Sequence, residues 1–249
     1  MDKKQFNINK NYNVWNNKDR WINDGEEWSE HFGTTDKLWD TILYPKIGKF
    51  IKGNVLEIAP GHGRITRKLL ESDINLDIID LSDTCIEKCR ERFDDKIDNY
   101  YVGNGSDLKG VKSNSKDFVI SFDSFVHMSK EVIDSYLNEI YRVLKPGGYC
   151  WIHHSDLVRG QDDNFNNWAG RSNFTIGEFK ILSNKYLFKL ISQELINWEA
   201  SNPYTESGIN PDWLQDGLSL IKKPDSNNKI IKDNLNIIKN SINIIENLL

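Results

Sequence analysis

Apolar runs of strand length alternate with segments of helical periodicity between residues 54 and 154. This alternation is typical of parallel βαβ units, whose strands are buried on both faces. The last helix of this region has its apolar residues three and four positions apart, and Lys145-Pro146-Gly147-Gly148 is expected to end it. The pattern predicts strands at 55–59, 76–81, 100–102, 117–122 and 149–153, and helices at 65–70, 83–93 and 130–144.

Segments of a different character flank this core. The first 52 residues are rich in aromatic side chains and predict helical pieces folded over the domain. After a polar loop at 156–173, the pattern predicts a helix at 176–186 and strands at 188–198 and 218–221. We expect a single domain over residues 1–249, made of an N-terminal helical cover (1–52), a catalytic α/β core (53–222) and a C-terminal helix (226–249).

The C-terminal tail repeats apolar residues at alternating spacings of four and three, namely Ile231, Leu235, Ile238, Ile242, Ile245 and Leu249. This is the a/d pattern of a coiled-coil seam, which predicts a homo-oligomer formed through the C-terminal helix. With only about three heptads, an amphipathic helix packed on its own domain explains the spacing equally well. Both interpretations stay open.

Composition and charge narrow the class of protein. The chain has 38% hydrophobic and 28% charged residues, and it lacks an apolar run long enough to cross a bilayer. Its N-terminus has no apolar stretch of the secretory kind, and its three cysteines do not suggest a disulfide framework, so we expect a cytoplasmic protein. A net charge of −5 with interspersed signs argues against nucleic acid as a partner.

The junction between the first strand and its helix carries a glycine-containing turn, Glu57-Ile58-Ala59-Pro60-Gly61-His62-Gly63-Arg64. Glycines at this place allow a tight turn and a close approach of the backbone to a ligand. About 20 residues later the second strand ends near Asp80, where a carboxylate can accept hydrogen bonds from both hydroxyls of a ribose. Together the two features predict an adenosine-containing cofactor.

The same turn lacks the features that hold phosphates. A dinucleotide-binding turn has a third small residue, whereas this chain has Thr66 at that position. The chain also lacks the G-x-x-x-x-G-K-[ST] loop that binds a triphosphate. A cofactor with ribose and adenine but without phosphate fits the sequence better.

Residues 53–155 resemble the core of the class I S-adenosylmethionine-dependent methyltransferases. The resemblance depends on the glycine turn, Asp80, Asp123 after the fourth strand, and Leu144-Lys145-Pro146-Gly147-Gly148 before the fifth. It implies a doubly wound, mostly parallel seven-stranded sheet with an antiparallel last strand, S-adenosylmethionine as the cofactor and S-adenosylhomocysteine as its product. It also implies that Glu57 and the backbone of Ala59, Gly61 and Gly63 hold the methionine part, Asp80 the ribose, Leu81 and the Asn104-Gly105-Ser106 turn the adenine, and Phe122-Asp123 the sulfonium side.

Two departures and one closer likeness qualify this family resemblance. The family usually has glycine at Ala59, and an alanine fits there only if its φ stays negative. Asp123-Ser124-Phe125-Val126 differs from the [DNS]-P-P-[YFW] motif of enzymes that methylate amines in nucleic acids. Several short segments, among them Trp28-Ser29-Glu30 and Ile152-His153-His154-Ser155, resemble bacterial methyltransferases of surface-polysaccharide (capsule) biosynthesis.

Histidines near strand ends are the candidate catalytic groups, because methyl transfer to a hydroxyl needs a base that removes the proton. His127 follows the fourth strand and His154 ends the fifth, and Asp123 completes the candidate set. Strand alternation places His153 and His154 on opposite faces, so one of them is expected to face the ligand. Asp123, Asp156, Asp162 and Asp163 could bind a divalent metal, but acidic loop residues are usually solvated, and no metal is predicted.

The sequence therefore predicts an O-methyltransferase whose acceptor is a small polar molecule, either a sugar or a phosphoramidate building block of a bacterial capsule. A hydroxyl acceptor requires the histidine base, whereas an already anionic phosphorus-linked oxygen does not. Three alternatives remain: a methyltransferase for another small metabolite, a non-catalytic module that binds the cofactor or a nucleotide, and a nicotinamide-dependent oxidoreductase.

Overall fold

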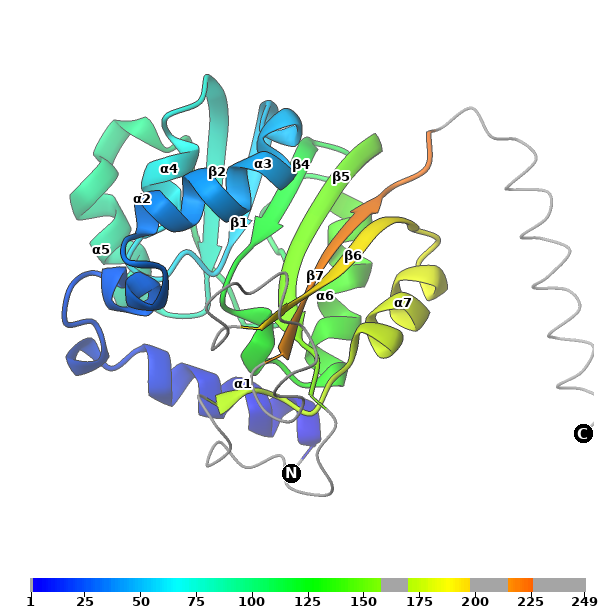
Figure 1. Cartoon of the computed structure of the whole chain (residues 1–249), viewed down its shortest axis with the longest axis horizontal. Coiled ribbons are helices and arrows are strands. Elements are labelled where there is room, and N and C mark those ends of the chain that lie inside the picture. Colours follow the sequence, from blue (N-terminus) through cyan, green and yellow to red (C-terminus); the bar gives the residue numbers. More distant parts are fainter. Residues whose placement is uncertain (1, 158–169, 198–214, 226–249) are drawn as a thin grey trace, which may run out of the picture.

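A computed structural model describes residues 2–157, 170–197 and 215–225, and these form an α/β fold around one seven-stranded sheet (Figure 1). The strands lie in the order β3-β2-β1-β4-β5-β7-β6. Their bounds are β1 Gly53–Ile58, β2 Ile74–Asp80, β3 Asn99–Val102, β4 Lys116–Ser121, β5 Leu144–Ser155, β6 Lys189–Asn197 and β7 Gln215–Lys222. The order reverses direction between β1 and β4, where ligands bind in doubly wound sheets.

The direction of one strand corrects the sequence prediction of a mostly parallel sheet. β1 to β5 pair in parallel, but β7 lies antiparallel between β5 and β6, and the sheet is therefore mixed. The predicted strand at 218–221 is the reversed one, with Trp151 opposite Leu220. β6 pairs with β7 on the side away from β5 and forms the edge of the sheet.

Alternate residues along each strand enter different hydrophobic layers. Val55 packs with Phe118 and Trp151 on one face, whereas Leu56 packs with Val119 and Ile152 on the other. The first layer is covered by α2 (Thr35–Leu38), α3 (Tyr44–Ile47), α4 (Thr66–Leu69) and α5 (Asp83–Phe93), and the second by α6 (Lys130–Val143) and α7 (Ile176–Lys185). Burial on both faces explains why the central strands read as continuous apolar runs.

The helices α1, α2, α5 and α7 begin at residues whose side chains accept hydrogen bonds from free backbone N–H groups. Ser82 accepts a hydrogen bond from the N–H of Cys85 at the start of α5, and Thr175 with Glu178 forms a capping box at the start of α7. α5 has the predicted bounds, and α6 ends one residue early because Leu144 is already extended and opens β5. β5 therefore begins before the predicted position and includes Pro146.

The N-terminal residues form α1 (Lys3–Trp15) and several short turns of helix, η1 (Lys18–Arg20), η2 (Glu26–Phe32), η3 (Trp39–Leu43) and η4 (Gly48–Phe50). Two more short turns are η5 (Asp94–Lys96) and η6 (Phe125–His127). α1 runs across the end of the sheet at which the parallel strands terminate (Figure 1). Asn7 and Asn11 tie it there, because both side-chain amides donate to the carbonyl oxygen of His127.

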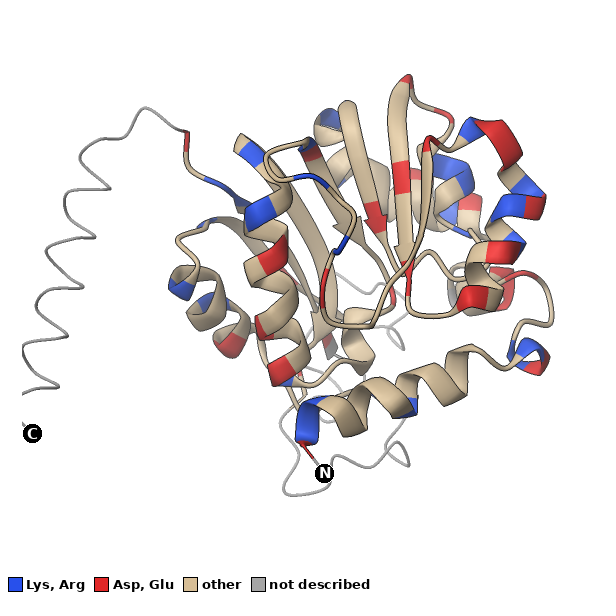
Figure 2. Ribbon diagram, turned by 180° about the vertical axis from the view of Figure 1, so that it is seen from behind, with Lys and Arg blue, Asp and Glu red and all other residues tan. Residues whose placement is uncertain are grey.

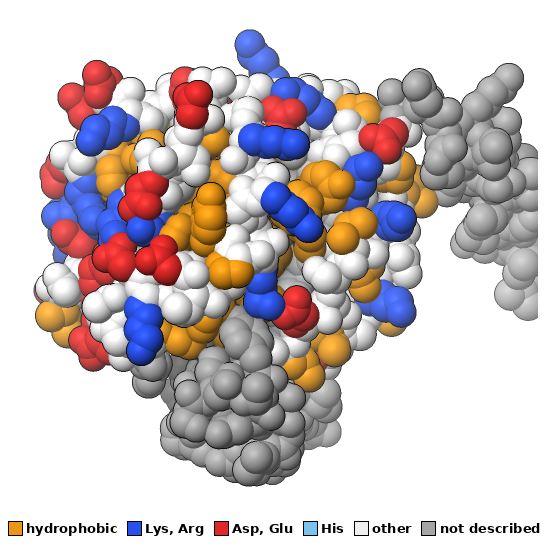
Figure 3. Space-filling model, turned by 45° about the horizontal axis from the view of Figure 1, so that its top comes forward, with side chains coloured by type: hydrophobic (Ala, Val, Ile, Leu, Met, Phe, Trp, Pro, Cys, Tyr) orange, Lys and Arg blue, Asp and Glu red, His pale blue; other side chains and the backbone are white. Residues whose placement is uncertain are grey.

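Charged residues lie mainly on the helices and loops, and the strands carry few of them (Figure 2). On the face shown in Figure 3, Lys and Arg side chains alternate with Asp and Glu. None of the helices described here combines the length and hydropathy that a transmembrane segment requires. The predicted C-terminal helix and its apolar repeat lie outside the described residues.

Candidate functional site

A cavity of about 580 Å³ lies where β1, β2 and β4 end, against α1. One wall comes from the N-terminal segment and includes Ile8, Trp15 and Trp28, and the other comes from the strand ends and from α6. Eight of the residues predicted from sequence line it: Ala59, Gly61, Asp80, Leu81, Gly105, Phe122, Asp123 and His127. The fold therefore brings both the predicted cofactor residues and a predicted catalytic histidine to one cavity.

The turn after β1 is tighter than the sequence led us to expect. Ala59 has a φ of +58°, so the expectation of a negative φ is wrong. Its N–H donates to the carbonyl oxygen of Ile79 at 2.7 Å, which fixes the residue against β2 just before the chain turns toward α4. At Gly61, φ is also +58°, and a Cβ would lie 2.4 Å from the ring of Trp21. Gly61 is needed both for its backbone angle and for this close packing.

Asp80 ends β2 with its carboxylate at the cavity wall. Its two oxygens accept hydrogen bonds from the N–H of Ser82 at 2.8 Å and from the N–H of Gly61 at 3.1 Å. Burial raises the pKa of Asp80 to about 6, although both N–H bonds favour the charged form. The residue therefore links the glycine turn to the end of the second strand.

Four predicted cofactor residues do not line the cavity. Glu57 accepts a hydrogen bond from the Thr66 hydroxyl at 2.6 Å, and burial raises its pKa to about 7. Gly63 packs against α5, because a Cβ would lie 2.3 Å from the ring of Phe93. Asn104 and Ser106 shape the turn around Gly105, where the Asn104 side chain accepts the N–H of Ser106 at 2.9 Å. These four residues support the residues that line the cavity.

Asp123 stands directly after β4 in a left-handed conformation, with φ of +60°. Its carboxylate accepts a hydrogen bond from Arg64 at 2.9 Å, and Arg64 also donates to the Ser29 hydroxyl at 2.7 Å. The guanidinium of Arg64 lies 5.5 Å from the centre of the Phe122 ring. An opposed pair of charges therefore lines the cavity beside the glycine turn.

His127 is the predicted catalytic histidine that meets the cavity. Its Nδ1 donates to the carbonyl oxygen of Gly170 at 3.0 Å, which leaves Nε2 as the nitrogen able to accept a proton. Burial and the nearby charge of Arg171 lower the pKa of His127 to about 4, so the ring is neutral at pH 7. The ring centroid of Trp15 lies 5.0 Å away.

His154 packs away from the cavity. It is fully buried, stacked on Phe179 with ring centroids 4.3 Å apart, and Nε2 bonds the Ser219 hydroxyl at 2.8 Å. Burial lowers its pKa to about 4. His153 faces the opposite side, as the strand alternation predicted, and its Nδ1 accepts the N–H of Asp123 at 3.0 Å. Of the two histidines proposed as catalytic, His127 lines the cavity and His154 does not.

A buried ionic group supports the cavity from the side of β7. Because His153 Nδ1 accepts from Asp123, its Nε2 carries the proton and donates to Asp216 at 3.0 Å. Arg171 donates from Nε and Nη2 to the same carboxylate, at 2.7 Å for the shortest contact. Burial alone would raise the pKa of Asp216, but Arg171 and His153 hold it well below its usual range.

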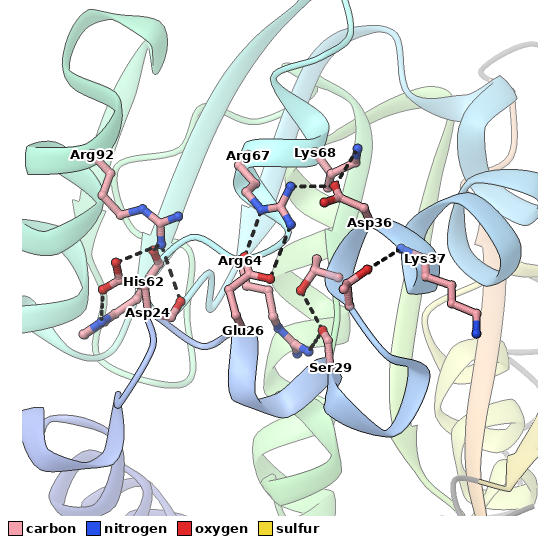
Figure 4. A network of polar contacts seen from close by, with 12 residues as sticks. Asp24, Glu26, Ser29, Asp36, Lys37, His62, Arg64, Arg67, Lys68 and Arg92 are labelled. Carbon is pink, nitrogen blue, oxygen red and sulfur yellow. Dashed lines mark hydrogen bonds and ion pairs between the residues drawn. The ribbon is translucent and has the colours of Figure 1, made fainter.

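The N-terminal segment is fixed to the glycine turn and to α4 and α5 by polar contacts (Figure 4). Glu26 pairs with Arg67 at 2.9 Å, and Asp36 pairs with the same guanidinium at 2.7 Å. Asp24 pairs with His62 at 3.4 Å, on whose ring Trp21 is stacked. These contacts hold the cavity wall of the N-terminal segment against the strand ends.

Sequence reasoning missed Arg64, Arg171 and Asp216. Arg64 directly follows Gly63 in the glycine turn, and this position in the sequence could have indicated that it lines the cavity. Arg171 and Asp216 are 45 residues apart, and no spacing rule links them. Within the described part of the chain, no three His, Cys, Asp or Glu side chains gather as a metal site, and Asp162 and Asp163 lie outside that part.

Comparison with known sequences places a recognised domain over this site. Residues 55–148 match a family described as a methyltransferase domain. The ubiquinone/menaquinone biosynthesis C-methyltransferase UbiE of Desulfotalea psychrophila is 31% identical over 122 residues, which cover 46% of each chain. The chain spans less than half the length of the curated relatives it matches.

Comparison with solved structures shows the fold. An S-adenosylmethionine-dependent methyltransferase of Leishmania major has a TM-score of 0.62 at 11% identity, covering 87% of this chain and 83% of that one. Phosphoethanolamine N-methyltransferase 2 of Haemonchus contortus, solved with phosphomonomethylethanolamine and S-adenosylhomocysteine, has a TM-score of 0.61 at 18% identity, covering 86% and 60%. The arrangement of strands and helices therefore matches that of these solved methyltransferases.

Proposed function

We propose that this chain, whose class I methyltransferase domain takes S-adenosylmethionine as its cofactor, transfers the methyl group to an oxygen of a small polar acceptor. The observation that carries the proposal is the single cavity shared by Asp80, the Ala59–Gly61 turn and His127. A sugar or phosphoramidate of a bacterial capsule is the acceptor that the sequence segments favour. The N-terminal segment forms one wall, which suits a small molecule.

The residues that line the cavity fit this cofactor. The carboxylate of Asp80 would hold the ribose hydroxyls, and Leu81 with Gly105 would border the adenine. The opposed charges of Arg64 and Asp123 match the carboxylate and the ammonium of the methionine part. Glu57 supports the turn through Thr66 and does not line the cavity. When bound, the cofactor supplies an electrophilic methyl carbon on a sulfonium.

The chain itself supplies position and a base. Asp123 is held by Arg64 and by His153, which fixes the end of β4 beside the cavity. His127 is neutral, and its Nε2 would accept the proton of an acceptor hydroxyl as the oxygen attacks. Trp15 and Phe122 line the same cavity, and their apolar rings would help to keep water from a bound cofactor and acceptor.

The first experiment measures cofactor binding. Calorimetry of the full chain with S-adenosylhomocysteine should show binding that Asp80→Ala weakens about 10- to 100-fold, because charge-assisted hydrogen bonds are lost. Asp95→Ala, an exposed carboxylate away from the cavity, is the matched control and should bind as the wild type does. Absence of binding by the wild type, or equal binding by Asp80→Ala, would overturn the cofactor site.

The second experiment identifies the acceptor atom. Nucleotide-linked sugars and phosphoramidates are incubated with S-adenosylmethionine, and the methylated product is located by NMR. His127→Asn should lower turnover about 10²- to 10⁴-fold for a hydroxyl and leave it unchanged for an anionic phosphorus-linked oxygen. Methylation at carbon or nitrogen would refute O-methylation, and binding without turnover of any acceptor would favour the non-catalytic module.

A further inference from the structure

Arg171 places a buried guanidinium at the cavity wall beside His127. Its side chain is 9% exposed, and it lines the cavity. Nε and Nη2 are both committed to Asp216, a carboxylate with no exposed surface. Asp216 also accepts from His153, so its position is fixed from two sides. The plane of the Arg171 guanidinium is therefore set by the fold before any ligand binds.

The backbone around Arg171 is held as firmly as its side chain. The carbonyl oxygen of Gly170 accepts from His127 Nδ1 at 3.0 Å. The N–H of Ser172 donates to the carbonyl oxygen of Val126 at 2.7 Å, and its own carbonyl accepts from the Ser155 hydroxyl at 2.8 Å. Arg171 thus stands on a segment anchored to both β5 and η6, next to the proposed base.

One edge of the guanidinium is left for a ligand. Asp216 occupies Nε and Nη2, and Nη1 makes no hydrogen bond with any residue in the described ranges 2–157, 170–197 and 215–225. Guanidinium N–H groups bind carboxylate and phosphate oxygens with matched planar geometry. On the cofactor side of the cavity, Arg64 and Asp123 already form a pair. Arg171 lines the same cavity near His127, whose pKa its charge lowers.

We propose that Arg171 binds a carboxylate or phosphate group of the methyl acceptor, and that Asp216 is the positioning residue that orients Arg171 for this contact. The inference rests on the proposed methyl transfer and adds a chemical class to its acceptor. An acceptor held in this way has its anionic group at Arg171 and its nucleophilic oxygen near His127. A neutral acceptor of the same size would offer the Nη1 donors no negatively charged oxygen and would bind more weakly.

The test uses three small probes of one shape: phenyl phosphate, benzoate and the neutral benzyl alcohol. Each is titrated by calorimetry into the full chain, with and without S-adenosylhomocysteine. We expect at least one anion to bind tenfold or more tightly than benzyl alcohol, and the stronger of the two identifies phosphate or carboxylate. Equal affinity for all three probes in both states of the wild type would overturn the proposal.

Variants separate an anion contact from a structural role. Arg171→Gln should lose the tenfold preference for anions while its affinity for S-adenosylhomocysteine stays within about twofold of the wild type. Arg90 on α5 lies over the ring of Tyr100 in β3, away from the cavity, and Arg90→Gln should change neither affinity. Asp216→Asn should weaken anion binding without weakening S-adenosylhomocysteine binding. The asparagine amide oxygen can still accept from His153, which holds Asp123, whereas the negative charge that orients Arg171 is lost.

A folding defect would not obscure the result. Arg171→Gln removes the cationic partner of the buried Asp216 carboxylate, which keeps the hydrogen bond from His153, whereas Arg171→Gln with Asp216→Asn removes both charges together. The double variant should fold and show no preference for anions. An unchanged preference in either folded variant refutes the role of Arg171. Failure of S-adenosylhomocysteine to bind the wild type refutes methyl transfer, and the titrations without it still decide whether Arg171 binds anions.

Discussion

Replacing Ala59 by glycine should stabilise this protein, although an alanine-to-glycine change usually does the opposite. Ala59 has a φ of +58°, and the hydrogen bond from its N–H to the carbonyl oxygen of Ile79, at 2.7 Å, holds it in this conformation. A left-handed conformation costs an L-residue about 1–2 kcal/mol, which glycine does not pay. Glycine also gives the unfolded chain more conformational freedom, which lowers the stability by about 0.4–1 kcal/mol and offsets part of the gain. The net expectation is about 1 kcal/mol more stability.

Urea unfolding followed by tryptophan fluorescence measures the free energy, and a thermal melt should show a rise of about 2–4 °C for a chain of this size. Lys180→Gly is the matched control, because Lys180 is exposed in the middle of α7 and its replacement should cost nearly 1 kcal/mol. Ala59→Val should destabilise, since a branched side chain is worse at positive φ. If Ala59→Gly loses as much stability as Lys180→Gly, the reasoning about strain at Ala59 is refuted.

Three further predictions concern buried titratable groups. Burial lowers the pKa of His154 to about 4, so its neutral ring contributes about 3 kcal/mol to the free energy of unfolding above pH 6.5, and this contribution is lost as the pH falls to 4. Urea unfolding of His154→Phe should lack this loss, and a pH dependence equal to that of the wild type would contradict the prediction. Glu57 has the opposite sign: its raised pKa gives a contribution of about 3 kcal/mol that is present below pH 4.5 and lost as the pH rises to 7, and the pH dependence of Glu57→Gln stability should differ from that of the wild type by this loss. For a hydroxyl acceptor, His127→Asn should lower kcat about 100-fold or more with S-adenosylhomocysteine affinity unchanged by calorimetry, and a weaker affinity would indicate a structural role instead.

Most of the fold was predictable because its signals are local. The helix at 83–93 was placed correctly from its periodicity, and each predicted strand overlaps an observed one. β5 began early because pairing between Lys116 and Leu144 extends it, and the register of a neighbouring strand is invisible in local sequence. An antiparallel last strand was expected from the family resemblance, and β7 is that strand; its antiparallel pairing with both β5 and β6 makes the sheet mixed.

The sequence by itself determined the succession of strands and helices along the chain, the place of the glycine turn, and the place of Asp80 at the end of the second strand. Each of these follows from neighbouring residues along the chain. Only the tertiary structure decided that His127 and not His154 lines the cavity, because that choice depends on which side chains fill the space around each ring. It alone brought Arg171 to Asp216 across 45 residues and forced Ala59 to positive φ. Such contacts arise when distant segments share one core, and no local periodicity encodes them.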